Sequence, residues 1–412
     1  EWSGTMNLTE PQAGSDLALL KSKAVHNDGN YKLYGNKIYI THGDQDMNEN
    51  IVHLVLARLP DAPEGSKGIS LFISPKYIVN KEGKTLEKND VRVVSIEHKL
   101  GTNASPTCVL AYGDNEGANA ELIGEKHGGL KAMFTMMNNA RLNVGIQGVS
   151  IAERSFQQAL NFSLSRQQGN SIDGSRDGTV TIIDHPDVQR MLMDMKSRIE
   201  AMRALSLFTA NELDLSKNAI STENKIRAQE NLDLLTPIVK AWCTDQGVLI
   251  ASTGVQVHGG MGFIEETGAA QHYRDARILP IYEGTNGIQA LDLLRRKLTL
   301  DNGNIFKRFL YDMRKDAKEC IETQEDKLVE IGKKVIFAID LLENTSDELL
   351  NMWKNSKRNA ASGATPFLDM CGNIFGAWIM AKSAIKAHNL LKDNKEDKFL
   401  NDKIETAYFY VN

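Results

Sequence analysis

The stretch Ile281-Tyr282-Glu283-Gly284-Thr285-Asn286-Gly287-Ile288-Gln289 places one carboxylate beside a glycine, directly before a predicted helix. Ile288, Leu291 and Leu294 recur at helical spacing, and Thr285 is a candidate cap for the first turn. A glutamate ahead of a helix commonly does no more than complement the helix dipole. The stretch therefore predicts a helix start and offers one candidate catalytic carboxylate.

The bulk composition is that of a globular protein with room for two or three domains in 412 residues. A net charge of −5 disfavours a general nucleic-acid-binding protein. No apolar run has the length of a membrane span. The four cysteines lack the paired spacing of a zinc site or a disulfide framework, and we predict no metal site. A reducing compartment fits this usage: we expect a bacterial cytoplasm, with the mitochondrial matrix as the alternative.

Residues 1–118 are predicted to form a β domain, either a sandwich or a barrel. Short runs rich in branched and aromatic residues are separated by Pro, Gly and Asp clusters, at 51–59, 68–74, 91–96 and 108–112. The run 31–41 predicts two short strands around a turn at Gly35-Asn36. Strands at this spacing, with no helices between them, favour a sandwich or barrel.

Residues 119–300 are predicted to form an antiparallel four-helix bundle, and residues 301–412 an additional helical domain, so the fold class is α+β multidomain. The first helix begins near residue 130, a polar loop follows Arg166, and Pro186 starts the second helix. The third helix covers about 223–252 despite Pro237, and the segment after Glu283 makes the fourth long helix.

Two further motifs accompany the stretch around Glu283. They are Thr9-Glu10-Pro11-Gln12-Ala13-Gly14-Ser15-Asp16 and Gln256-Val257-His258-Gly259-Gly260-Met261-Gly262. In this order the three resemble the flavin-dependent acyl-CoA dehydrogenases, from residue 1 to about 300. The last part of the chain resembles the extra helical domain of larger members, including those described as acting on methylthiopropanoyl-CoA. In that family a helical domain precedes the first motif, so we expect this chain to be part of a longer polypeptide.

The resemblance implies FAD as the cofactor. The residues at the matching positions are Met6, Leu8, Thr9, Tyr39, Thr41, Arg166, Gln256, Gly259, Gly260 and Thr285. Arg166 is implied to reach the FAD of a neighbouring subunit, where a guanidinium suits a pyrophosphate. Gln168 stands where the family often has an aromatic residue. The Gly259-Gly260 pair follows a helical stretch and not a strand, so it is no Rossmann fingerprint; glycines there allow backbone N–H groups to approach a phosphate.

The resemblance also implies contacts to an acyl-CoA substrate from Ser15, Ser105, Asn138, Arg141 and Gly284. Glu283 matches the family's base, which removes the α-proton of the thioester while a hydride passes from Cβ to flavin N5. Burial of such a carboxylate raises its pKa towards the working range. Some members carry the base immediately before the arginine that Arg141 matches, but here that position is Ala140.

The implied function is oxidation of an acyl-CoA to the trans-2-enoyl-CoA, with electrons passed to electron transfer flavoprotein, by a homodimer or a dimer of dimers. Two alternatives remain open. One is an acyl-CoA oxidase, which has the same fold and hands electrons to oxygen. The other is a non-enzymatic flavoprotein related to the DNA-associated alkylation-response proteins, which the mixed charge of residues 301–412 disfavours.

Overall fold

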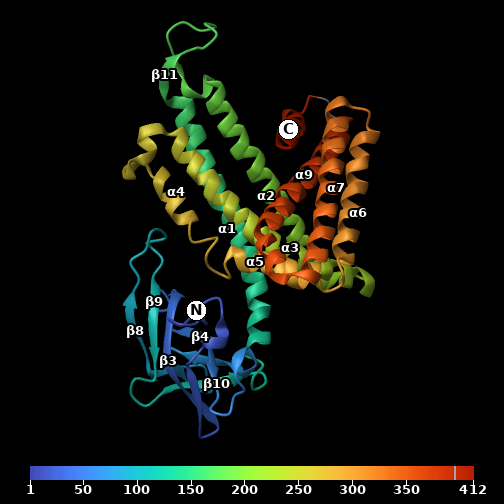
Figure 1. Cartoon of the computed structure of the whole chain (residues 1–412). Coiled ribbons are helices and arrows are strands. Elements are labelled where there is room, and N and C mark those ends of the chain that lie inside the picture. Colours follow the sequence, from blue (N-terminus) through green and yellow to red (C-terminus); the bar gives the residue numbers. More distant parts are fainter. Residues whose placement is uncertain (394–395) are drawn as a thin grey trace. The chain divides into compact units, whose positions relative to one another are not determined.

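The computed structural model describes residues 1–393 and 396–412. These residues divide into two compact units, unit 1 (Glu1–Asn139) and unit 2 (Ala140–Asn412), coloured blue to teal and green to red in Figure 1. The long helix α1 (Gly129–Ser165) begins in unit 1 and ends in unit 2. None of the helices in the described ranges combines the length and the apolar character that a membrane crossing requires.

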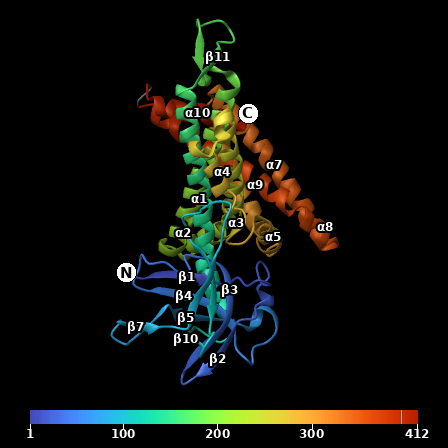
Figure 2. The ribbon, with the colours of Figure 1, turned by 90° about the vertical axis from the view of Figure 1, so that its left-hand side faces the viewer.

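Unit 1 is built on one curled sheet. Its strands are β1 (Ser3–Asn7), β2 (Lys23–Asn27), β3 (Asn30–Thr41), β4 (Ile51–Arg58), β5 (Ile69–Pro75), β8 (Val91–Ile96), β9 (Thr107–Tyr112) and β10 (Ala118–Ile123). The order is β1-β4-β5-β10-β3-β9-β8, and Figure 2 shows β1, β4, β5 and β10 in that sequence. Because β2 pairs with both β3 and β4, the sheet closes on itself like a barrel. Of the two predicted architectures, a sandwich or a barrel, the sheet is barrel-like.

The prediction of two strands around Gly35-Asn36 is wrong, because β3 runs unbroken from Asn30 to Thr41. The turn lies earlier, at Asp28-Gly29, where φ is +47° and +85° and a tight hairpin joins β2 to β3. Gly35 serves a different purpose. A Cβ there would lie 2.5 Å from Ser22 Oγ, so glycine permits the segment before β2 to approach β3.

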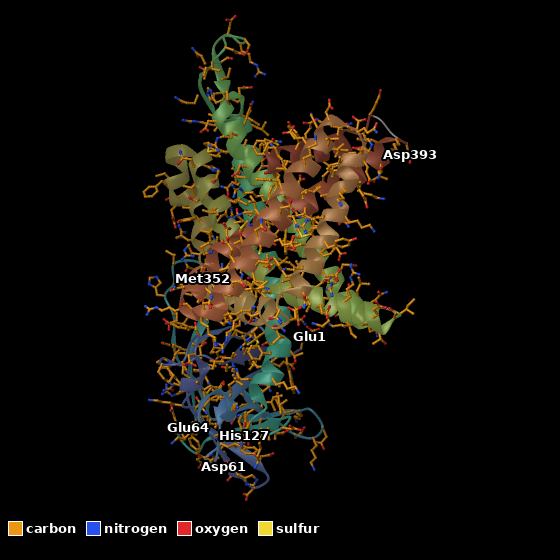
Figure 3. All side chains as sticks on the ribbon, turned by 45° about the vertical axis from the view of Figure 1, so that its right-hand side comes forward. Glu1, Asp61, Glu64, His127, Met352 and Asp393 are labelled. Atoms are coloured by element: carbon orange, nitrogen blue, oxygen red, sulfur yellow. The ribbon has the colours of Figure 1, made fainter. Side chains whose placement is uncertain are left out.

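Short elements complete unit 1. They are the 3₁₀ turns η1 (Leu17–Leu19) and η2 (Gly65–Gly68) and a small hairpin of β6 (Tyr77–Val79) and β7 (Thr85–Lys88). Asp61 and Glu64, labelled in Figure 3, lie in the loop between β4 and β5. Phe72, Leu33 and Leu110 are among the fully buried residues of the core inside the sheet.

A chain of hydrogen bonds between buried polar side chains also crosses unit 1. Thr5 Oγ1 lies 2.7 Å from His53 Nδ1, Asn7 Nδ2 donates to Thr5 Oγ1 at 2.7 Å, and the Tyr112 hydroxyl donates to Asn7 Oδ1 at 3.1 Å. Burial lowers the pKa of His53 to about 4. These hydrogen bonds connect β1 to β4 and β9, and they therefore specify the register of β1, the strand that carries Met6.

Unit 2 is almost entirely helical. After α1 come the hairpin of β11 (Gln167–Asn170) and β12 (Thr179–Thr181), η3 (Ile182–Asp184), α2 (Pro186–Asn218), α3 (Thr222–Val257), η4 (Gly259–Phe263), η5 (Glu265–Thr267), α4 (Ala269–Ala276), α5 (Asn286–Asp292) and the π-helix η6 (Leu293–Leu298). The start of α2 at Pro186 and the passage of α3 through Pro237 are confirmed.

Two predictions for this region are wrong. The segment after Glu283 is a short helix that widens into a π-helical turn, and not a fourth long helix. The segment after Arg166 is a hairpin and not only a loop, because polar residues paired across β11 and β12 satisfy their backbone groups.

Glycines bring α1 and α3 together. A Cβ on Gly148 would lie 2.4 Å from the Cys243 carbonyl oxygen, and one on Gly247 would lie 3.0 Å from the Gly148 carbonyl oxygen. The two helix backbones therefore approach more closely than side chains with a Cβ would allow. This approach sets Arg141 on α1 and Lys240 on α3 within electrostatic reach of one another.

The remaining helices share this core. They are α6 (Asn304–Glu322), α7 (Asp326–Asn355), α8 (Lys357–Ser362), α9 (Ala364–Leu391) and α10 (Lys398–Val411). Helices α6, α7 and α9 lie side by side (Figure 1). Trp242 of α3 packs against Gly372 of α9 and donates to Asn373 Oδ1 at 3.1 Å. Residues 301–412 thus belong to the same compact unit as the helices before them.

Candidate active site

The turn that carries Glu283 is held in an unusual backbone conformation. Glu283 has φ of +54° and Gly284 has φ of +84°, so two consecutive residues are left-handed. For a residue with a side chain this conformation costs roughly 1–2 kcal/mol. Hydrogen bonds from Tyr282 N to the Ile278 carbonyl (3.1 Å) and from Asn286 N to the Pro280 carbonyl (2.9 Å) fasten the turn on both sides. Because strained backbone clusters at functional sites, this turn is a candidate site.

Two side chains donate hydrogen bonds to the Gly284 carbonyl. It accepts from Lys240 Nζ at 2.8 Å and from Gln289 Nε2 at 3.3 Å. Lys240 Nζ also donates to Asn286 Oδ1 at 2.8 Å. Helix α3 and helix α5 therefore both fix the position of the turn.

Burial raises the pKa of Glu283, and the nearby charges of Arg141 and Lys240 oppose that rise. The Arg141 side chain is itself buried, which lowers its pKa; its Nη1 lies 3.8 Å from Asp292 Oδ2. Burial also raises the pKa of Tyr282 to about 12, and its hydroxyl donates to Gln147. The site thus combines a desolvated carboxylate with two cations, the setting expected of a general base.

Helix α5 begins immediately after this turn. Thr285 is its N-cap, as predicted, and the Thr285 hydroxyl accepts from Ile288 N at 3.3 Å. A hydroxyl that accepts one hydrogen bond still has a proton to donate. The predicted cofactor contact of Thr285 is therefore compatible with its capping role.

In unit 1, the loop with Leu8 and Thr9 is fastened to β3. Lys37 Nζ donates to the Leu8 carbonyl at 3.1 Å, and Ile38 N donates to the Thr9 carbonyl at 2.9 Å. Met6 lies on β1, opposite Leu54 of β4. The structure therefore brings the first motif beside the middle of β3.

Tyr39 lies at an irregularity of β3. The pairing of β3 with β9 shifts register between Lys37 and Ile40, and Tyr39 has φ of +60°. Bulges of this kind redirect a side chain, and the Tyr39 side chain is 62% exposed. Thr41, at the end of the strand, is also exposed. An exposed aromatic ring and an exposed hydroxyl thus stand two residues apart at the end of this strand.

The remaining predicted cofactor contacts lie around the end of α3 and just after α1. Gln256 is the second-last residue of α3, and Gly259 and Gly260 follow the helix in an exposed 3₁₀ turn. Gly259 has φ of +57°, and a Cβ on either glycine would meet no atom within 4 Å, so open space faces this backbone. Arg166 follows α1 and is exposed, and within the described residues its guanidinium has no ion pair.

The predicted substrate contacts also divide between the units. Ser15 and Asn138 are exposed in unit 1, while the Ser105 hydroxyl lies 3.3 Å from His42 Nε2. Arg141 and Gly284 lie together in unit 2, where a Cβ on Gly284 would be 3.7 Å from Arg141 Nη2.

Sequence reasoning missed Lys240 and Gln289. Lys240 and Gln289 are both fully buried, and both contact the carbonyl that follows Glu283. The available signal was a single lysine in the apolar run of residues 234–243. A lone charge in a predicted buried face indicates a specific partner.

Comparison with known proteins identifies all three parts of the chain. Residues 5–114 match the middle domain of acyl-CoA dehydrogenases, residues 127–298 match their C-terminal domain, and residues 309–412 match the acetyl-CoA dehydrogenase C-terminal-like domain. A 3-methylmercaptopropionyl-CoA dehydrogenase of Ruegeria pomeroyi is 47% identical over 418 residues, covering 100% of this chain and 69% of that protein.

Solved structures agree with this result. Caenorhabditis elegans ACDH-11 in complex with C11-CoA superimposes with a TM-score of 0.80 at 26% identity, covering 99% of this chain and 64% of that one. A Bacillus anthracis acyl-CoA dehydrogenase complexed with FAD has the same fold, with a TM-score of 0.78 at 21% identity over 99% of this chain and 66% of that one. The chain spans about two thirds of the length of these relatives. It belongs to the acyl-CoA dehydrogenase family.

Proposed function

We propose that this chain forms the catalytic part of an FAD-dependent dehydrogenase that oxidises the Cα–Cβ bond of an acyl-CoA thioester, with Glu283 as the base. The observation that carries the proposal is the Glu283 turn: a half-buried carboxylate with a raised pKa, held in a left-handed backbone conformation beside two buried cations. Family membership supplies the reaction class.

The residues present suit FAD. Tyr39 offers an exposed ring next to the Thr41 hydroxyl, the open backbone at Gly259 and Gly260 suits a phosphate, and the Arg166 guanidinium is available to a pyrophosphate. A relative of the same fold is complexed with FAD. When bound, FAD supplies the acceptor for the hydride that leaves Cβ.

The roles that we propose for the side chains and backbone of this protein follow from their chemistry. The Glu283 carboxylate takes the α-proton, and the electrons of that C–H bond form the Cα–Cβ double bond as the hydride departs. The enolate charge that develops on the thioester oxygen needs hydrogen-bond donors. The Glu283 N–H has no acceptor in the described ranges of the chain, so it is free to donate to that oxygen. The Arg141 and Lys240 charges oppose the rise that burial causes in the pKa of Glu283, and they therefore favour its ionised form.

Several finer features are part of the same proposal. They are the division into a middle β domain (1–118), a helical bundle that carries Glu283 (119–300) and an additional helical domain (301–412). We also propose electron transfer flavoprotein as the electron acceptor and a homodimer or dimer of dimers as the assembly. Slow reoxidation of the reduced protein in air would separate a dehydrogenase from an oxidase.

Anaerobic mixing of the FAD-loaded protein with a panel of acyl-CoA thioesters tests the function. The panel includes butyryl-CoA and 3-methylmercaptopropionyl-CoA, the substrate named for the Ruegeria relative. We expect at least one thioester to bleach the flavin absorbance and to yield a product lighter by two hydrogens in mass spectrometry. If the protein binds FAD but none of the thioesters bleaches the flavin absorbance, the proposal is overturned.

A further inference from the structure

Lys240 is a buried lysine whose ammonium donates to neutral oxygens. Its side chain is fully buried in α3, in a run of apolar residues that includes Ile238, Val239 and Ala241. Within the described ranges it forms no ion pair, and its acceptors are two neutral oxygens, those of Gly284 and Asn286. Taking an ammonium out of water costs several kcal/mol, which neutral acceptors only partly offset. A methionine of similar length would avoid that cost, so stability does not explain the lysine.

Both hydrogen bonds that the Lys240 ammonium donates lead to the Glu283 turn. Asn286, the second acceptor, donates in turn to the Ala241 carbonyl at 3.1 Å and to Thr244 Oγ1 at 3.0 Å. The ammonium and the Asn286 amide therefore connect one turn of α3 to both Gly284 and the start of α5. The left-handed pair at Glu283 and Gly284 persists because these hydrogen bonds restrain it.

We propose that Lys240 is a positioning residue for the base: its ammonium holds the Gly284 carbonyl, and thereby fixes the left-handed turn that aims the Glu283 carboxylate. This inference rests on the proposed role of Glu283. A displacement of about 1 Å at a reacting group lowers the rate on the order of 100-fold. The gain in rate from a fixed Glu283 carboxylate can therefore offset the free energy lost when the Lys240 ammonium is buried.

The charge of Lys240 has a second effect, on the titration of Glu283. The groups that face Glu283 are Arg141 from α1 and Lys240 from α3, with Tyr282 beside it on the same segment. Asp245 faces Lys240 from α3, and Asp292 and Arg296 face Arg141 from α5 and η6. Burial lowers the pKa of Lys240 to about 8, so it is protonated at neutral pH and helps to keep Glu283 ionised. Without that charge, Glu283 binds its proton more tightly.

Lys240→Met, which removes both the hydrogen bonds and the charge, is the test. Hydrogen exchange, measured by mass spectrometry on the peptide 281–288, reports how firmly the backbone of the turn is held. This measurement does not depend on catalytic turnover. We expect exchange there to accelerate about tenfold. In stopped-flow reduction by acyl-CoA, we expect the limiting rate to fall between about 10- and 100-fold while the apparent substrate affinity stays within about twofold. The acid limb of the pH–rate profile should move up by about one unit.

Two further variants sharpen the result. Lys297→Met is the matched control, because Lys297 also joins α3 to the segment after Glu283, through a 3.5 Å ion pair with Asp233, but does not contact the turn. It should leave hydrogen exchange at 281–288, the kinetics of flavin reduction and the acid limb of the pH–rate profile unchanged. Lys240→Gln retains an amide donor without the charge, so it should restore slow exchange while the acid limb stays shifted. It also serves as the test variant if Lys240→Met does not fold.

The outcomes separate this inference from the proposed function. If Glu283→Gln still reduces flavin at the wild-type rate, the proposed function fails whatever Lys240 does. If Glu283→Gln is inactive but Lys240→Met shows wild-type exchange and both Lys240 variants show a wild-type acid limb, only the positioning role is overturned. Loss of stability with unchanged exchange at 281–288 and unchanged pH dependence would also overturn it, because it would show a purely structural lysine.

Discussion

The Lys37 ammonium lies 2.8 Å from the Glu10 carboxylate in unit 1, and the two side chains are 0% and 3% exposed. Glu10 also accepts from the backbone N–H groups of Lys21 (2.7 Å) and Ser22 (3.1 Å). Lys37 stands two residues before Tyr39 and donates to the Leu8 carbonyl. One buried ion pair thus connects the first motif to the strand that presents Tyr39.

Lys37→Met is expected to destabilise the protein strongly, because the Glu10 carboxylate would stay buried without its cation. Loss of one partner from a buried pair costs about 3–5 kcal/mol. Calorimetric unfolding at pH 7 measures the change. The control is Arg92→Met, which breaks the exposed pair with Asp114 and should cost less than about 1 kcal/mol. Equal effects of the two substitutions would contradict the argument.

Glu283→Gln is expected to abolish reduction of FAD by substrate while FAD stays bound. Glutamine retains the shape of the side chain and lacks the basicity, so proton removal should slow by several orders of magnitude. Anaerobic stopped-flow absorbance measures the rate. Glu266→Gln, at an exposed position, controls for the loss of one negative charge. Bleaching by Glu283→Gln at near the wild-type rate would refute the assignment.

The elements predicted best from the sequence are those with a strong local signal. Apolar periodicity together with Pro186 located α2, and Thr285 located the start of α5. The error at residues 31–41 arose because a Gly-Asn pair commonly marks a turn. Here Gly35 meets a need that only tertiary structure reveals, the close approach of Ser22.

The part of the candidate site with a strong local signal was also predictable from the sequence. Glu283 stands in a recognisable motif and Arg141 at a position that the family resemblance implies, and the structure sets them within electrostatic reach of one another. Lys240 lies 43 positions before Glu283 and meets the turn only because glycines let α1 and α3 pack closely and α5 folds back over α3. Such long-range polar contacts leave no periodic signal in the sequence. The roles of the other predicted contact residues remain predictions.

His53 is expected to make the protein acid-sensitive. Its pKa is lowered to about 4 in the folded state against 6.5 in the unfolded state, so between these values the unfolded chain binds more protons. Its contribution to stability is complete above about pH 6.5 and is lost as the pH falls towards 4. From pH 7 to pH 5 that loss is about 2 kcal/mol. Calorimetry of wild type and His53→Gln at both pH values measures it.

The comparison of the two proteins isolates His53 from other titrating groups. His272 also has a lowered pKa, and its contribution is common to both proteins. The wild type should lose about 2 kcal/mol more than His53→Gln over this range. A variant with the same acid sensitivity as the wild type would show that His53 is protonated in the folded state.

Arg166→Ala is expected to weaken the retention of FAD, and to loosen the oligomer if the arginine crosses a subunit boundary. Arg166 is exposed, and in the described part of the chain its guanidinium has no ion pair, so its loss should leave the thermal stability of the apo-protein unchanged. Absorbance after dialysis measures the FAD content. Arg190→Ala, on the exposed start of α2, is the control. Full FAD occupancy of Arg166→Ala through dialysis would return the residue to an ordinary surface charge.

Gly284→Ala is expected to damage both stability and catalysis, because the backbone there has φ of +84°. An alanine in the left-handed region costs roughly 1–2 kcal/mol. Its Cβ would also lie 2.7 Å from Gln289 Nε2, and moving that side chain breaks its hydrogen bond to the Gly284 carbonyl, which adds about 1 kcal/mol. We expect a total loss of about 2–3 kcal/mol together with slower flavin reduction.

Gly287→Ala provides the matched control three residues later. Gly287 lies in α5 without a positive φ, and its added Cβ would meet nothing closer than Thr285 Oγ1 at 3.9 Å. Alanine favours a helix over glycine by about 1 kcal/mol, so this variant should be as stable as the wild type or more so. Calorimetry and stopped-flow reduction on both variants separate the two positions. If Gly284→Ala unfolded at the wild-type temperature and reduced flavin at the wild-type rate, the left-handed turn would have no part in aiming Glu283.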